Sequence, residues 1–197
     1  MNSIDMDQLV RLINELPGIS ERDKIKYLSI ILLYYENKCA GRVFVHKTLG
    51  YTERKTRSSI SKLVDKGFLH KTNYSVCISE QVSKTLQGLV INRYILGKQV
   101  LVSINSFPQE ILENIKYKIL RFRDYIVIHT MDPYSLEITG YTIRDKINIP
   151  GLPEELAIKY RKLIKDLIGN NSLFILWNHY RKYIYDSIAL FSLYKVL

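Results

Sequence analysis

The side chains best suited to chemistry in this 197-residue chain are basic ones that gather in one stretch. Residues 41–71 hold eight Lys or Arg side chains and two acidic ones, so most of the chain's net charge of +10 lies there. Lys and Arg bind anionic partners such as the phosphates of nucleic acids. A solvated charged face is the alternative explanation of any basic run, so the elements that carry these residues must be considered next.

Catalytic and metal-binding patterns are missing from the sequence. None of the four His side chains stands three or four residues from another His or from a Cys. Glycine-rich phosphate loops and the GxSxG nucleophile motif are also absent. His129 with Asp132 could line a polar pocket. Arg144 with Asp145 could do the same, but polar residues at strand ends and turns usually meet water. We therefore expect no catalytic residue, no metal site and no cofactor, and we do not expect an enzyme.

The two cysteines and the apolar stretches bear on the cellular compartment of the protein. Cys39 and Cys77 are too few for a disulfide framework and lack CxxC spacing, so we expect both to pack as small apolar side chains. No apolar signal segment opens the chain, and its least charged stretch, residues 187–194, is far shorter than the roughly 20 residues that span a bilayer. We therefore expect a cytoplasmic protein with no membrane partner. The high Ile, Lys and Tyr content suggests an archaeal source, although an AT-rich genome gives the same bias.

Hydrophobic periodicity and turn residues divide the first ninety residues into helices and two short strands. Helices are expected over residues 5–16, 20–37, 42–49, 52–66 and 79–90. Strands at 68–71 and 75–78 enclose a hairpin at residues 72–74. Ser20 and Thr52 are suited to cap the second and fourth helices, and Gly67 is suited to end the fourth.

This order of elements, with the sequence GRVFVHKTLGYTERKTRSSISKLVDKGFLHKTNYSVCIS at residues 41–79, resembles the winged helix-turn-helix domain of bacterial and archaeal transcription regulators. The matching stretches are residues 41–50, the cap Thr52, and residues 63–69, in which Leu, Gly, Phe and Leu lead into the hairpin. The resemblance spans roughly residues 20–90. It implies that residues 52–66 form a recognition helix for the major groove of double-stranded DNA, with the hairpin as the wing.

Helical geometry supports the same interpretation. Ile60, Leu63 and Val64 form the apolar stripe of the expected recognition helix, and its opposite side is basic and hydroxylic, with Asp65 as the only acid. Lys and Arg can contact phosphates, and Arg, Ser and Thr can also reach base edges. An ordinary exposed face would carry mixed charges instead. The residues that we expect to bind DNA are Arg42, Thr52, Arg54, Lys55, Arg57, Ser58, Ser61, Lys62, Lys71 and Asn73. At the wing tip, a plain turn with Asn73 in a left-handed conformation explains the residues equally well.

The division along the chain is expected near residue 90, with the winged helix-turn-helix domain at 1–90 and a small α+β domain at 91–197. Strands are expected at 99–104, 125–130, 136–143, 146–149 and 173–177, and helices at 108–122, 153–168 and 178–197. Residues 125–151 loosely resemble the C-terminal part of uncharacterised archaeal winged-helix proteins. Domains in this position bind a small-molecule effector or form dimers, and Asp132, Arg144 or Asp145 would lie at the mouth of an effector pocket.

The uncharged stretch at residues 187–194 predicts a helix that is buried on most sides. Either this helix forms a homodimer interface or it packs wholly inside its own domain. We therefore expect a sequence-specific, DNA-binding transcriptional regulator of α+β class that forms a homodimer through its C-terminal domain. The alternative is a winged-helix protein-interaction module of a transcription or replication assembly.

Overall fold

A computed structural model describes residues 5–105 and 107–197, and the chain divides into two compact units. We call them the N-terminal unit, residues 5–87 and 181–191, and the sheet unit, residues 88–180 and 192–197. Helices and two antiparallel sheets make up the chain, so the expected α+β class is confirmed. The segment 181–191 differs from expectation, because it belongs with the N-terminal residues and not with the second half of the chain.

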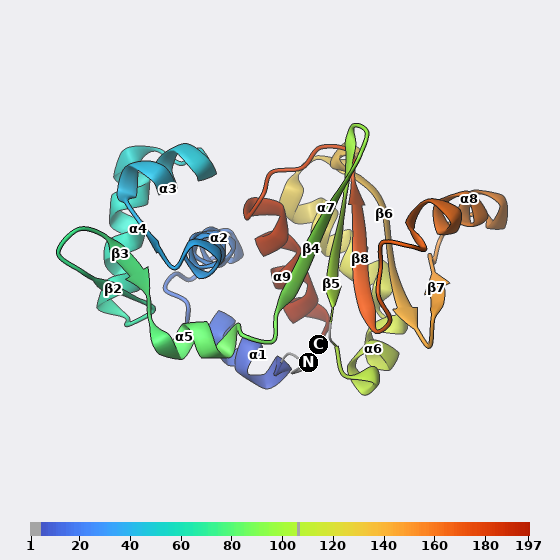
Figure 1. The fold of residues 1–197 in the computed structure, drawn as a ribbon, viewed down its shortest axis with the longest axis horizontal. Coiled ribbons are helices and arrows are strands. Elements are labelled where there is room, and N and C mark those ends of the chain that lie inside the picture. Colours follow the sequence, from blue (N-terminus) through green and yellow to red (C-terminus); the bar gives the residue numbers. More distant parts are fainter. Residues whose placement is uncertain (1–4, 106) are drawn as a thin grey trace. The chain divides into compact units, whose positions relative to one another are not determined.

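Five helices and a small sheet form the first part of the N-terminal unit (Figure 1). The helices are α1 (Met6–Glu15), α2 (Glu21–Asn37), α3 (Arg42–Leu49), α4 (Glu53–Asp65) and α5 (Glu80–Thr85). The strands are β1 (Cys39–Ala40), β2 (Leu69–Lys71) and β3 (Val76–Ile78), in the order β1-β3-β2. Helix α2 supplies much of the core, since its residues 27–34 are all buried.

The ends of the helices follow the capping residues seen in the sequence. The Ser20 side chain accepts a hydrogen bond from the Asp23 amide, and Thr52 accepts one from Lys55. At the end of α4 the Phe68 amide donates to the Leu63 carbonyl at 2.9 Å, while Gly67 has a φ of 77°. This left-handed turn favours glycine, and it directs the chain from α4 straight into β2.

The two cysteines do not pack as separate apolar side chains, so that expectation is wrong. Cys39 in β1 and Cys77 in β3 are register partners in adjacent strands and form a disulfide bond. The bond also removes the argument for a reducing compartment that rested on these residues.

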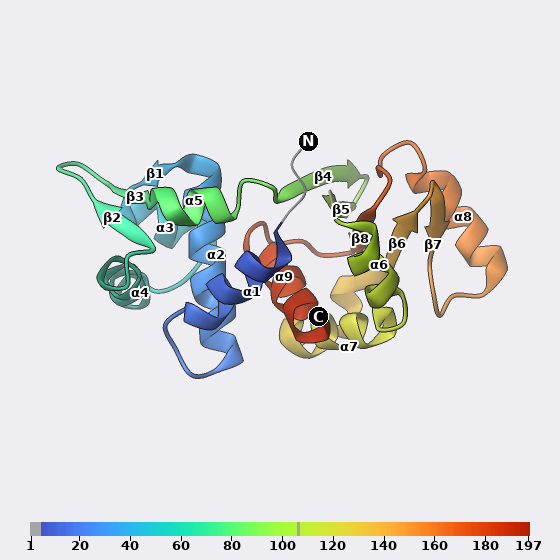
Figure 2. The ribbon, with the colours of Figure 1, turned by 90° about the horizontal axis from the view of Figure 1, so that it is seen from below.

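An antiparallel five-stranded sheet organises the sheet unit, in the order β4-β5-β8-β6-β7. Its strands are β4 (Val90–Leu96), β5 (Gln99–Asn105), β6 (Leu136–Ile143), β7 (Lys146–Asn148) and β8 (Ser172–Trp177). Its helical elements are α6 (Gln109–Lys116), α7 (Ile119–Thr130), the short η1 (Pro133–Ser135) and α8 (Glu154–Ile164). Helix α8 covers one face of the sheet, and α6 and α7 lie on the other (Figure 2). Because β8 is central and covered on both faces, all six of its residues are buried.

Two expected elements of this region are wrong. The helix expected at 79–90 stops at Thr85, and residues 90–96 form strand β4, which pairs along its whole length with β5. The strand expected at 125–130 is the second half of α7, in which Phe122 and Ile126 continue a helical stripe. Both stretches are rich in β-branched or aromatic residues, and their tertiary neighbours decide which structure they adopt.

The last helix, α9 (Ile184–Val196), is divided between the units, since residues up to 191 belong to the N-terminal unit. Within the part of the chain that the structure describes, no helix is both long and apolar enough to cross a membrane.

Candidate functional site

Helix α4 presents one buried and one exposed side, as the sequence pattern indicates. Thr56, Ser59, Ile60 and Leu63 are buried, while Val64 is half-buried. All ten residues that the sequence singles out are exposed: Arg42, Thr52, Arg54, Lys55, Arg57, Ser58, Ser61, Lys62, Lys71 and Asn73. The surface of α4 is therefore the candidate site.

Ion pairs divide the basic residues around α4 into two groups. The Glu53 carboxylate lies 3.3 Å from the Arg42 guanidinium and 3.5 Å from that of Arg57. Arg54 and Lys55, in contrast, make no ion pair with any residue of the described ranges. Glu53 thus partly neutralises Arg42 and Arg57 at the edge of the site, whereas Arg54 and Lys55 can pair with an anionic ligand.

A cavity of about 430 Å³ opens beside this surface, between α4 and the start of α2. Thr52, Lys55 and Lys62 line it from α4, and Asp23 and Lys26 line it from α2. Sequence reasoning missed the α2 residues, because their proximity to α4 depends on tertiary packing.

Asp23 is the acid of this cavity and is already engaged. Its carboxylate accepts a hydrogen bond from Lys26 at 2.6 Å and another from Ser20. The Lys26 hydrogen bond, helped by the Ser20 bond and by the positive charges of Lys26 and Lys62, lowers the pKa of Asp23 below its ordinary value. Asp23 consequently stays ionised and balances part of the Lys62 charge.

The hairpin between β2 and β3 is closed by its own polar groups. The Thr72 amide donates to the Ser75 carbonyl at 2.9 Å, and the Thr72 hydroxyl accepts from the Ser75 amide at 3.1 Å. Asn73 does not adopt a left-handed backbone, so the left-handed conformation expected for it in a plain turn is wrong. Lys71, Asn73 and Tyr74 are exposed around the tip.

The connection between α3 and α4 is fixed by hydrogen bonds to its flanks. The His46 imidazole contacts the Tyr51 carbonyl at 2.5 Å, and the Tyr51 hydroxyl contacts that of Ser29 on α2 at 3.0 Å. Arg181, from the later segment of the same unit, donates to the Leu49 carbonyl at 3.3 Å. These contacts set the position of α4 relative to α2 and α3.

The polar residues considered for a pocket in the second half have local roles instead. Asp132 accepts from the Tyr134 amide and begins η1, before β6. Arg144 and Asp145 form the tight turn after β6, with φ values of 50° and 60°. Since β6 has eight residues, the two places lie roughly 25 Å apart and would belong to different pockets. Among the described residues, no group of three or more His, Cys, Asp or Glu side chains is arranged to hold a metal ion.

Comparison with known proteins bears on the fold. No family model and no curated protein matches the chain. A solved structure, the hypothetical protein PH0730 from Pyrococcus horikoshii OT3, is similar with a TM-score of 0.52 and 15% sequence identity. The match covers 87% of this chain and 89% of that one. At this level of identity the likeness concerns the fold alone.

Proposed function

We propose that the N-terminal unit is a winged helix-turn-helix domain that binds double-stranded DNA, and that the protein is a transcriptional regulator and not an enzyme. The order α2, β1, α3, α4, β2, β3 and the sheet order β1-β3-β2 support this proposal. In this arrangement α4 is the recognition helix, and the hairpin between β2 and β3 is the wing.

The observation that carries the proposal is the exposed basic side of α4, on which Arg54 and Lys55 lack ion-pair partners among the described residues. An α-helix with its side chains is about 10–12 Å across and enters a major groove about 12 Å wide. The small side chains of Ser58 and Ser61 in the middle of this side allow close approach to base edges. Phosphates then lie beside Arg54, Lys55 and Lys62.

The remaining residues act at the margins of the same interface. Thr52 caps α4, and a helix N-terminus attracts a phosphate through its free amides. Lys71 and Asn73 on the wing are placed to contact the DNA backbone beside the groove. Arg42 and Arg57 extend the basic surface along α3 and α4 while Glu53 orients them.

DNA binding measured as a function of salt tests the proposal. Arg54→Ala with Lys62→Ala should weaken binding to duplex DNA and reduce the slope of log affinity against log salt by about two. The control is Lys162→Ala with Lys165→Ala, which removes the same charge from exposed positions at the end of α8. Equal affinity and slope in the two folded double variants would overturn the proposal.

A protein-interaction module is the second candidate, because α3 exposes two apolar side chains. Val43 and Phe44 are 56% and 48% exposed. Under this alternative, Val43→Ser with Phe44→Ser abolishes binding to a protein partner, and the α4 double variant leaves it intact. Under the DNA-binding proposal, the α4 double variant weakens DNA binding, and Val43→Ser with Phe44→Ser leaves it unchanged.

We also propose that the protein forms a homodimer through the sheet unit. Exposed apolar side chains at the end of α7 and in η1 support this site: Ile128 is 62%, Met131 80% and Tyr134 81% exposed. Dimers of DNA-binding domains contact two half-sites about one helical turn apart. No cofactor is required for this function.

A further inference from the structure

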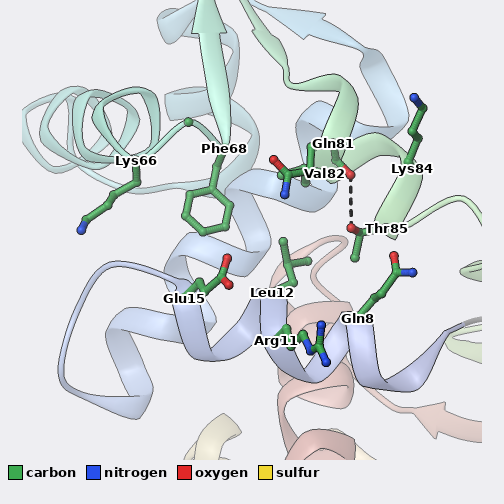
Figure 3. A pocket seen from close by; sticks show the side chains of 11 residues that line it. Gln8, Arg11, Leu12, Glu15, Lys66, Phe68, Gln81, Val82, Lys84 and Thr85 are labelled. Carbon is green, nitrogen blue, oxygen red and sulfur yellow. Dashed lines mark hydrogen bonds between the residues drawn. The ribbon is translucent and has the colours of Figure 1, made fainter.

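A second cavity of the N-terminal unit, of about 560 Å³, lies away from the exposed side of α4 (Figure 3). Its walls come from α1, from the turn that ends α4, and from α5. Cavities that bind small molecules have volumes of roughly 300–1,000 Å³. The space is therefore large enough for a metabolite of amino-acid size.

The floor of this cavity is apolar. Leu12, Phe68 and Val82 come from the three walls, and each is only 5% exposed. Figure 3 shows the Phe68 ring lying between α1 and the end of α4, with Leu12 below and Val82 beside it. A flat or branched apolar group fits this floor, because an aromatic face and two aliphatic side chains surround it.

The rim of the cavity carries two opposite charges on one helix face. Arg11 and Glu15 lie on α1 four residues apart, which places them one turn from each other on the same side. Neither forms an ion pair with the other or with any residue of the ranges described. Across the cavity, Lys84 is occupied, because its ammonium lies 2.7 Å from Glu80, whereas Lys66 at the end of α4 adds a second cation with which the carboxylate of a ligand can pair.

We propose that this cavity binds a free amino acid with a large apolar side chain. Its carboxylate pairs with Arg11, its ammonium pairs with Glu15, and its side chain covers Phe68, Leu12 and Val82. An amino acid satisfies both charges and the apolar floor at once, whereas a simple acid or amine satisfies only one charge.

The position of Phe68 gives such a ligand access to the DNA-binding elements. The Phe68 amide bonds to Leu63 at the end of α4, and its carbonyl accepts from the Ser79 amide, before α5, at 3.0 Å. A ligand on the Phe68 ring therefore touches the junction of recognition helix, wing and α5. We infer that it changes DNA affinity, a step that rests on the proposed function.

Calorimetric titration of the DNA-free protein with L-phenylalanine tests the site. We expect saturable binding that 3-phenylpropanoate, which lacks the ammonium, and phenethylamine, which lacks the carboxylate, reproduce only weakly. Arg11→Gln should weaken L-phenylalanine at least tenfold without affecting phenethylamine, and Glu15→Gln should do so without affecting 3-phenylpropanoate. Arg144→Gln and Glu155→Gln are the matched controls on the sheet unit, and they should leave all three affinities unchanged.

Absence of binding at 10 mM L-phenylalanine and L-leucine would overturn the site, and so would equal losses in the matched controls. The link to DNA is measured separately, as DNA affinity with and without saturating L-phenylalanine. An unchanged DNA affinity would overturn the regulatory step and leave the site standing. Failure of the α4 double variant to alter DNA binding would overturn the proposed function and not the titration result.

Discussion

At the scale of single residues, Glu53 determines how much of the basic surface is free. Its carboxylate lies between the guanidinium groups of Arg42 and Arg57, and all three side chains are substantially exposed. Exposed ion pairs contribute little to stability, typically about 0–1 kcal/mol. Glu53 therefore affects the net charge of this surface more than it affects the stability of the fold.

Replacing Glu53 by Gln should strengthen DNA binding. The change releases Arg42 and Arg57 and removes a negative charge near the phosphates, so affinity at low salt should rise several-fold and the salt dependence should steepen. Fluorescence anisotropy at several salt concentrations measures both quantities. Glu155→Gln on α8 removes the same charge from the sheet unit and should change neither. A weaker affinity for the Glu53 variant would show that the ion pairs position Arg42 and Arg57 for contact.

Tyr160 and Glu137 should make the sheet unit sensitive to alkaline pH. The Tyr160 hydroxyl donates to the Glu137 carboxylate, and this bond, together with burial, raises the pKa of Tyr160 to about 12. The unfolded chain has the ordinary value of 10.0, so the stabilisation is complete below pH 10 and is lost as the pH rises toward 12. Between pH 9 and pH 11, the midpoint of urea unfolding should fall less in Tyr160→Phe than in the unchanged protein. An equal fall in both proteins would contradict the assignment.

At the scale of elements, the disulfide is the strongest constraint on the small sheet. It joins β1 to β3 across 38 residues that include α3, α4 and the hairpin. A cross-link that closes a loop of this length stabilises a fold by about 4 kcal/mol in the chain-entropy model. The bond therefore holds α4 and the hairpin between β2 and β3 within one closed loop.

Reduction of this bond should lower the melting temperature by roughly 10 °C. Thermal unfolding with and without a dithiol reductant measures the effect. Cys39→Ser with Cys77→Ser should melt at the lower temperature and should not respond to the reductant. A melting temperature that is insensitive to both changes would show that the bond does not constrain the unfolded chain.

The elements also show which parts of the fold the sequence predicts. Helices α2 and α4 were predictable because Ser20, Thr52 and Gly67 carry local capping information. The exposed side of α4 followed from helical spacing alone. Strand β4 and the second half of α7 were not predictable, since both stretches depend on pairing or packing with distant residues. The same limit applies to Asp23 and Lys26 beside α4, and to the disulfide, whose cysteines meet only after β1 and β3 pair.

At the scale of the whole chain, the uncharged stretch at residues 187–194 lies in α9 and is largely buried within a single chain, without a second copy. Leu190 and Phe191 are at most 1% exposed within a single chain. Residues 181–191 belong to the N-terminal unit, where Lys182 lies 2.5 Å from Glu36 and the Asn37 amide donates to the Tyr183 hydroxyl at 3.2 Å. The sequence could not show this return of the chain to its first unit. The burial of this helix favours packing within one chain over a dimer interface on its surface.

The buried apolar side of α9 and the exposed apolar side chains at the end of α7 should therefore respond differently to an introduced charge. Leu190→Glu buries a carboxylate at a position with no exposed surface, so the variant should unfold or become insoluble. Ile128→Glu with Met131→Glu places the charges on an exposed surface, so that variant should stay folded and lose only the proposed dimer. Light scattering should give about twice the 23.1 kDa chain mass for the unchanged protein and a single chain mass for the α7 variant.

Ile158→Glu on α8 is the control for an exposed apolar position and should remain a dimer. A monomeric unchanged protein at high micromolar concentration would contradict the dimer, and a folded, soluble Leu190→Glu would contradict the burial of α9.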